Sequence, residues 1–197
     1  MIFGADFSPF FLFSLWNPIM EHDYHDLINI FNRCFYQEYN TKLEKGGDEP
    51  IYLPADENRT YHSIRFAHGY YSSALHEIAH WLVAGRSRWL LEDFGYWYEP
   101  DGRSEEQQRL FEQVEVKPQA IEWILSNAAG KRFFASADNL SGQVGNPQPF
   151  KNAVYAQVCR YAEQGLPKRA ETLRRALCEF YHTENRIDLS LFDPQKI

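Results

Sequence analysis

The sequence predicts an α+β protein: a helix-rich single domain with a small sheet. Apolar residues recur at helical spacing in several long stretches, and two short stretches have the composition or the alternation of strands. No repeat, low-complexity tract or obvious linker divides the 197 residues, of which 44% are hydrophobic. The chain is therefore long enough and apolar enough for one packed core.

The N-terminal half is predicted as helix, strand, strand and helix. Residues 20–38 carry apolar side chains every three or four positions, as on one face of a helix. A turn containing two glycines precedes a short strand at 51–55, and residues 61–68 alternate as a second strand. The next helix is predicted over 70–84, with Gly85 as a suitable residue for its end.

The C-terminal half is predicted to be mostly helical. Ser104 is a suitable N-cap for a helix that starts at Glu105. Pro118 lacks an amide hydrogen and clashes with the preceding turn, so a kink or a restart is predicted near Lys117. The remaining predicted elements are a helical stretch ending at Gly130, a loop-rich region at 131–148, and helices at 149–165 and 168–183.

The first residues are expected to lie ahead of the domain. Residues 1–19 are interpreted as an extension and residues 20–197 as the single domain, with Met20 as a candidate alternative start. The apolar run at 7–16 is too short to span a bilayer, and neither a preceding Lys or Arg nor a small-residue cleavage site accompanies it. We therefore expect no signal peptide and no membrane partner.

Charge and cysteine content narrow the class of protein. The formal net charge is −7, which argues against general binding to nucleic acid or to an anionic membrane. The three cysteines are far apart and form no CxxC pair. They are interpreted as reduced, rather than as a disulfide framework or a Cys-rich zinc site, and the protein is expected in the cytoplasm.

The motif HEIAH at residues 76–80 predicts a metal site. His76 and His80 lie one turn apart on one helical face, so both imidazoles can bind one cation at about 2.0–2.1 Å. Glu77 points roughly 100° away from His76, so it can act beside a metal-bound water without being a ligand. It is also the one charged side chain of an otherwise uncharged stretch, where a buried carboxylate needs partners. Two histidines that bind nothing are the alternative.

A third ligand is expected from a carboxylate further along the chain. The candidates are Glu92, Asp93, Asp101, Glu112, Glu115 and Glu122. Residues 111–123 are the preferred source because they belong to the next substantial amphipathic helix. The core side of that helix is expected at Leu110, Val114 and Ile121. On an ideal wheel Glu112 then faces solvent, whereas Glu115 and Glu122 lie on the flank. We choose Glu115, close to the disturbance at Pro118; a solvated helix carboxylate is the alternative.

Four stretches, in this order, resemble the bacterial elongation factor P hydroxylases. They are EPIYLPAD (49–56), FAHGYYSSALHEIAHW (66–81), DFGYWYEPDGR (93–103) and FEQVEVKPQA (111–120). The resemblance covers roughly residues 20–183 without large gaps and does not cover 1–19. The HExxH motif alone is weakly specific, whereas four blocks in one order are highly specific.

This resemblance implies a cytosolic enzyme that hydroxylates a modified lysine side chain on translation elongation factor P. It also implies a fold like that of a bacterial metal-dependent ribonuclease, and an iron(II) centre with His76, His80 and Glu115 as ligands. Two His and one carboxylate leave positions open for molecular oxygen and substrate, as in non-haem iron oxygenases. No motif places a basic residue for 2-oxoglutarate, so this co-substrate is left open.

Two other functions compete with this hypothesis. A zinc-dependent hydrolase, either a peptidase or a nuclease, would use the same motif with Glu77 as the general base for a zinc-bound water. A non-enzymatic partner of the translation machinery with a closed zinc site would need a fourth protein ligand, for which His68 is the candidate. His68 is otherwise a candidate for a hydrogen bond to a ligand.

Overall fold

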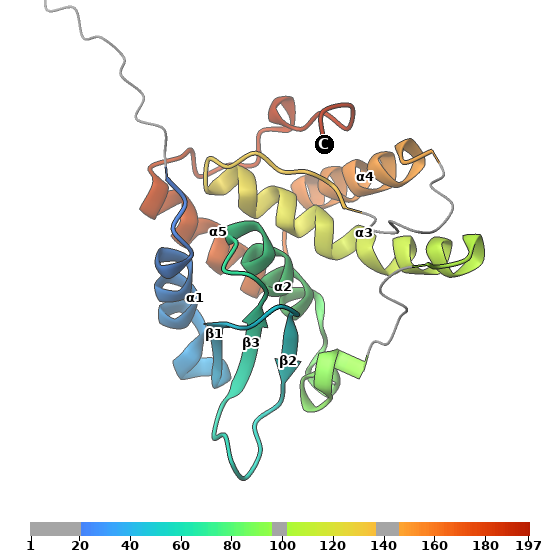
Figure 1. The fold of residues 1–197 in the computed structure, drawn as a ribbon. Helices are drawn as coiled ribbons and strands as arrows, with labels where there is room; N and C mark the ends of the chain where they lie inside the picture. Colours follow the sequence, from blue (N-terminus) through green and yellow to red (C-terminus); the bar gives the residue numbers. More distant parts are fainter. Residues whose placement is uncertain (1–20, 96–101, 137–145) are drawn as a thin grey trace, which may run out of the picture.

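The computed structural model describes residues 21–95, 102–136 and 146–197 (Figure 1). Within these ranges the α-helices are α1 (Tyr24–Tyr39), α2 (Tyr71–Val83), α3 (Glu105–Ala128), α4 (Gln148–Gln164) and α5 (Lys168–Tyr181). The strands are β1 (Thr41–Lys45), β2 (Ile51–Leu53) and β3 (His62–Phe66), and short 3-10 turns occur at Arg86–Leu90, Glu92–Gly95 and Leu189–Leu191. The prediction of a helix-rich α+β protein with a small sheet is confirmed. The extension predicted at 1–19 lies outside the described residues.

The sheet has the strand order β1-β3-β2, with β1 parallel and β2 antiparallel to β3. Strands β2 and β3 correspond to the two predicted strands, whereas β1 has no counterpart in the prediction. Leu43, the one large apolar residue of β1, is buried and pairs with Ile64 at the middle of β3. Its backbone amide also donates to Asn32 Oδ1 of α1 at 2.9 Å, so helix α1 covers the edge of the sheet.

Helix α2 lies at the centre of the fold, packed against β3 and α3, with α1 and α5 beside it (Figure 1). Leu75, Ile78 and Trp81 of this helix are all fully buried. The Trp81 ring packs against the rings of Phe31 and Phe35, with centroids 5.3 and 5.0 Å apart. This apolar packing holds α2 in place and leaves its histidines to face α3.

Helix α3 is continuous through Pro118, so the predicted restart near Lys117 is wrong. From residue 118 onwards the helix is buried on two sides. Ile121 and Leu125 pack in the main core, while Trp123 packs in a second cluster with residues of α4. This tertiary packing stabilises the helix by more than the missing hydrogen bond of the proline costs.

The first half of α3 is exposed, which corrects two expectations for its core side. Leu110 and Val114 are 51% and 42% exposed, whereas Ile121 is fully buried. Packing of α3 against the rest of the protein therefore begins at about Glu115, which is 1% exposed. A helical wheel that assumes one core-facing side along the whole of α3 therefore assigns exposed residues of its first turns to the core.

The glycines that follow α2 and α3 have different backbone conformations. Gly85 follows α2 with φ −74°, an ordinary extended conformation, so the expected glycine turn is absent there. Gly130 follows α3 with φ +67°, in the region that favours glycine. Among the described helices, none combines the length and the apolar character needed to cross a membrane.

Candidate metal centre

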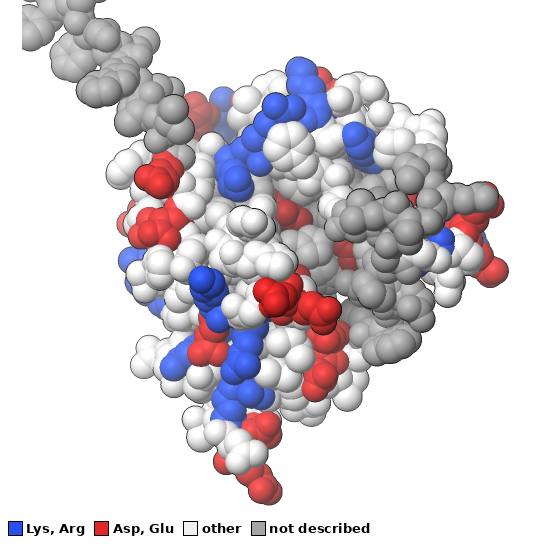
Figure 2. All heavy atoms as spheres, in the orientation of Figure 1, with Lys and Arg blue, Asp and Glu red and all other residues white. Residues whose placement is uncertain are grey.

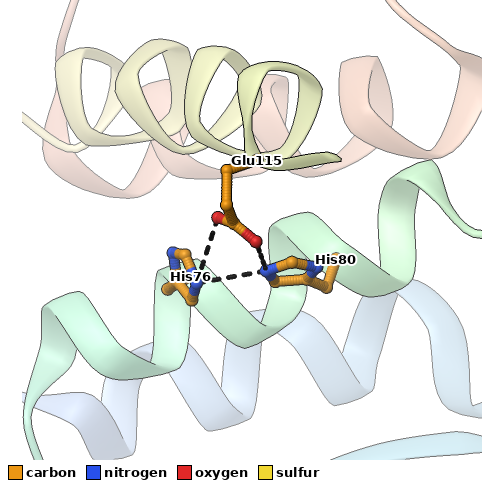
Figure 3. Close-up of side chains that lie close together, drawn as sticks. All are labelled: His76, His80 and Glu115. Atoms are coloured by element: carbon orange, nitrogen blue, oxygen red, sulfur yellow. Dashed lines mark hydrogen bonds and ion pairs between the residues drawn. The ribbon is translucent and has the colours of Figure 1, made fainter. Parts of the chain in front are cut away.

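Helices α2 and α3 bring three potential metal ligands together (Figure 3). His76 and His80 extend from α2, and Glu115 extends from α3 toward both imidazoles. One donor atom from each of the three lies within 4.8 Å of the other two. Glu115 is buried and the two histidines are partly buried. The structure therefore brings together the three residues that the sequence singled out as ligands.

The distances between the donor atoms fit one small cation. His76 Nε2 lies 3.1 Å from His80 Nε2, and His80 Nε2 lies 3.2 Å from Glu115 Oε1. His76 Nε2 lies 3.7 Å from Glu115 Oε2. Donors about 2.1 Å from one ion are about 3.0 Å apart at a right angle and about 3.4 Å apart at the tetrahedral angle. Two imidazoles and a carboxylate at these separations suit iron or zinc with little movement of the helices.

Glu122 of α3 fixes the orientation of the His76 ring. Its Oε2 lies 2.8 Å from His76 Nδ1. Because an ionised carboxylate can only accept a hydrogen bond, Nδ1 carries the proton, and in the neutral ring Nε2 then presents a lone pair to the cluster. A carboxylate bonded to the far nitrogen of a histidine is the usual support of a metal-binding imidazole. Glu122, which the sequence offered only as a ligand, thus has a supporting position.

Charges within the centre are paired. Burial lowers the pKa of His76, but the hydrogen bond and the charge of Glu122, together with Glu115, raise it to about 10. Burial raises the pKa of Glu115, but the charge and hydrogen bond of His80, followed by His76, lower it to about 2. The carboxylates therefore favour positive charge at this point of the molecule, and a bound cation would compete with a proton for Nε2 of His76.

Gln119 links Glu115 to the chain that follows α3. Its Nε2 donates to Glu115 Oε2 at 3.3 Å and to the carbonyl oxygen of Ser136. The Ser136 amide donates in return to Gln119 Oε1 at 3.1 Å. Sequence reasoning missed this residue. The available signal was the spacing of Glu115, Gln119 and Glu122, which places three polar side chains on one face of a helix.

Glu77 lies close enough to the cluster to feel its charges. Burial raises the pKa of Glu77, the positive charges of His76 and His80 lower it, and the carboxylates of Glu115 and Asp93 raise it further. The net shift is upward. Within the described part of the chain no residue forms a hydrogen bond with Glu77. A partly buried carboxyl with a raised pKa beside a cation site is suited to binding or exchanging a proton.

The other candidate carboxylates have different surroundings. Asp93 accepts a hydrogen bond from the backbone amide of Tyr52 at 2.7 Å, which ties the 3-10 turn to β2. Glu112 accepts one from the side-chain amide of a residue one turn earlier, at 3.1 Å. Glu92 is exposed, and Asp101 lies outside the described residues. Among these candidates, only Glu115 joins the two histidines in the described structure.

His68 does not join the cluster. Its Nδ1 lies 3.9 Å from Asp48 on the neighbouring turn, and its ring packs against Tyr70. No fourth His, Cys, Asp or Glu among the described residues completes the group. This arrangement differs from a closed structural zinc site, which has four protein ligands. Figure 2, drawn in the orientation of Figure 1, shows a hollow near the centre of the molecule, with Asp or Glu atoms visible inside it.

These features define the class of protein. The α+β fold brings two imidazoles from α2 and a carboxylate from α3 together at a candidate metal position. The sequence model of the elongation factor P hydroxylase family matches residues 30–192, and the chain belongs to this family. The elongation factor P lysine hydroxylase of Haemophilus influenzae is 71% identical over 174 residues, which cover 88% of this chain and 98% of that protein.

Proposed function

We propose that this chain hydroxylates a modified lysine side chain of elongation factor P, at a metal ion held by His76, His80 and Glu115. Family membership and the name of the 71% identical relative support the reaction and the protein substrate. The observation that carries the site is the convergence of three donor atoms within 4.8 Å from two adjacent helices. The likeness to a metal-dependent ribonuclease fold and a cytoplasmic location remain parts of the same hypothesis.

The donor set favours iron(II) with molecular oxygen as co-substrate. Two His and one carboxylate on one side of a metal ion leave coordination positions for oxygen and substrate, and bound iron(II) would supply the oxygen-activating chemistry. The protein's own contribution is to hold the two lone pairs of the imidazoles and one carboxylate oxygen at fixed positions. Glu122 and Gln119 support that arrangement through His76 and Glu115.

Acidic side chains near the centre suit a cationic substrate. Glu77 and Asp93 both raise the electrostatic preference for positive charge close to the ligands. A lysine-derived side chain carries an ammonium group that such carboxylates attract. We propose that Glu77 contacts the incoming substrate or its proton rather than the metal, because it lies roughly 100° from His76 around α2 and is not among the three residues whose donor atoms converge.

The test combines metal content with turnover. We expect protein purified without oxygen to contain iron. When oxygen and a two-electron reductant are supplied, it should add one oxygen atom to the modified lysine of elongation factor P while the second oxygen atom is reduced to water, and the product is detected by intact-protein mass. His76→Ala and Glu115→Ala should lose both bound metal and product. His25→Ala and Glu106→Ala, exposed residues on α1 and α3, serve as matched controls and should retain both. Ligand variants that hydroxylate as fast as the wild type would contradict the site.

The competing function is a zinc-dependent hydrolase, favoured by the HExxH motif and by the position of Glu77 beside the ligands. In that case the purified protein would contain zinc at full occupancy. Its hydrolytic activity would be the same with and without oxygen. Glu77→Gln would abolish that hydrolysis while leaving the zinc content unchanged. This combination of results would replace the hydroxylase proposal.

A further inference from the structure

We infer that Gln119 is a positioning residue for the metal centre: by binding Oε2, its side-chain amide holds the Glu115 carboxylate in the orientation that presents Oε1 to His80. This inference rests on the proposed metal site and assigns a role to a residue outside the three ligands. Gln119 lies one turn after Glu115 on α3 and is 1% exposed, so its partners are protein groups.

The orientation of the Gln119 amide follows from its contact with Ser136. The Ser136 backbone N–H can only donate, and it lies 3.1 Å from Gln119 Oε1. The oxygen of the amide is therefore on the Ser136 N–H side, and the NH2 group faces the Ser136 carbonyl and Glu115. The usual ambiguity between amide oxygen and nitrogen is resolved by this pairing.

This orientation assigns different tasks to the two oxygens of Glu115. Oε2 accepts the hydrogen bond from Gln119 at 3.3 Å and lies 3.7 Å from His76 Nε2, whereas Oε1 makes the shorter contact with an imidazole, 3.2 Å from His80 Nε2. With Oε2 held by an amide donor, the carboxylate is restrained in one rotamer and offers Oε1 to a cation. Without that donor the buried carboxylate could rotate or bind through both oxygens, which changes the geometry of the centre.

The position of Ser136 is in turn fixed by α3. After Gly130 the chain turns back, and residues 131–136 run along α3 (Figure 1). Lys131 N donates to the carbonyl of Ser126 at 2.8 Å, and the Phe133 ring stacks on Trp123 with centroids 5.5 Å apart. The returning segment is therefore packed on the helix that carries Glu115, and Gln119 connects the two at the level of the ligand.

The experiment tests the positioning role of Gln119 with Co(II) as the probe. Gln119→Met keeps the length of the side chain and removes its polar atoms. Ser136→Pro removes the N–H that orients the amide, whereas Ser136→Ala keeps every backbone group. Gln157→Met is the matched control, because Gln157 is also a buried glutamine but pairs with Arg160 on α4. The measured quantities are Co(II) affinity, the visible spectrum of the Co(II) protein, and the unfolding temperature of the metal-free protein.

We expect Gln119→Met and Ser136→Pro to weaken Co(II) binding about 10- to 100-fold and to alter the Co(II) spectrum. Ser136→Ala and Gln157→Met should bind Co(II) as the wild type does, even if Gln157→Met unfolds at a lower temperature. Wild-type affinity and spectrum in Gln119→Met would overturn the inference, and if that variant fails to fold, the same result in Ser136→Pro would do so. A wild-type chain that binds no Co(II) overturns the inference together with the metal site. Wild-type Co(II) binding without lysine hydroxylation contradicts the proposed function alone.

Discussion

Glu122 should control the affinity of the centre for metal without touching the ion. Its Oε2 lies 2.8 Å from His76 Nδ1, and the two side chains are only 9% and 27% exposed. Glu122→Gln keeps the shape and an acceptor oxygen but removes the charge. Glu122→Leu removes the acceptor as well. Both changes weaken the preference for a proton on Nδ1. They therefore disfavour the tautomer of His76 in which Nε2 offers its lone pair to the metal.

The expected size follows from the burial of this pair. A hydrogen bond between charged groups contributes about 1.5–3 kcal/mol when it is shielded from solvent. A loss of that size lowers metal affinity roughly 10- to 100-fold. Glu122→Gln should fall near the lower limit because a neutral hydrogen bond remains, and Glu122→Leu near the upper limit.

Competition with a chromophoric chelator measures the affinity of each variant for Co(II) or Zn(II). The matched control is Asp23→Asn, since Asp23 and His25 form an equally short pair of 2.8 Å at the surface, with 53% and 65% of the side chains exposed. Asparagine also preserves the N-cap of α1. Wild-type affinity in both Glu122 variants would refute the argument that Glu122 sets the state of His76. A loss of affinity in Asp23→Asn would show that the effect is not local.

Four further substitutions test stability, and their effects are measured by urea unfolding. Gly69→Ala should lower the free energy of unfolding by about 1–2 kcal/mol, because Gly69 has φ +70° and its new Cβ would lie 3.1 Å from a side-chain carbon of β1. Gly85→Ala, at φ −74° with open space around it, should leave it unchanged. Pro118→Ala should raise it by about 1–2 kcal/mol, because a helical hydrogen bond is restored at the expense of some ring packing; a decrease would mean that the buried ring matters more. Glu171→Gln should lower it by about 1 kcal/mol at neutral pH. The hydrogen bond from Arg174 is the largest cause that lowers the pKa of Glu171 below 4.5. The stability that the charged Glu171 contributes is therefore present above pH 4.5 and is lost as the pH falls through the lowered pKa. A pH-independent loss would contradict this account.

The helices were predictable because their signal is local. Helices corresponding to α1, α2, α4 and α5 were predicted within a few residues of their bounds, and the cap at Ser104 located the start of α3. Strand β1 was missed because its five residues include only one large apolar side chain, Leu43, and because its partner β3 lies about twenty positions later. The continuity of α3 was missed for a related reason. The penalty at Pro118 is local, whereas the packing that overrides it comes from α4 and the main core.

The candidate site was partly readable in the same way. HEIAH places His76 and His80 on one face by helix geometry alone, and the structure agrees. Glu115 was selected on a wheel whose expected core side included Leu110 and Val114, and both of these are exposed. Its meeting with the histidines depends on how α2 and α3 pack, which periodicity does not encode. The roles of Glu122 and Gln119 depend on the same contact and on a segment that returns along α3.

The polar face of α3 is costly as a purely structural feature. Glu115, Gln119 and Glu122 are all less than 10% exposed, although the helix around them is packed on both sides. Buried ionic pairs are often no more stabilising than apolar residues of the same size, so stability alone gives little reason for this arrangement. A cation between the imidazoles and Glu115 does give a reason. It would use both nitrogen lone pairs and the carboxylate at once, and it would add to the apolar packing that already joins α2 and α3. Metal binding should then stabilise the two helices against separation, by a free energy that grows with the logarithm of the affinity that Glu122 and Gln119 maintain.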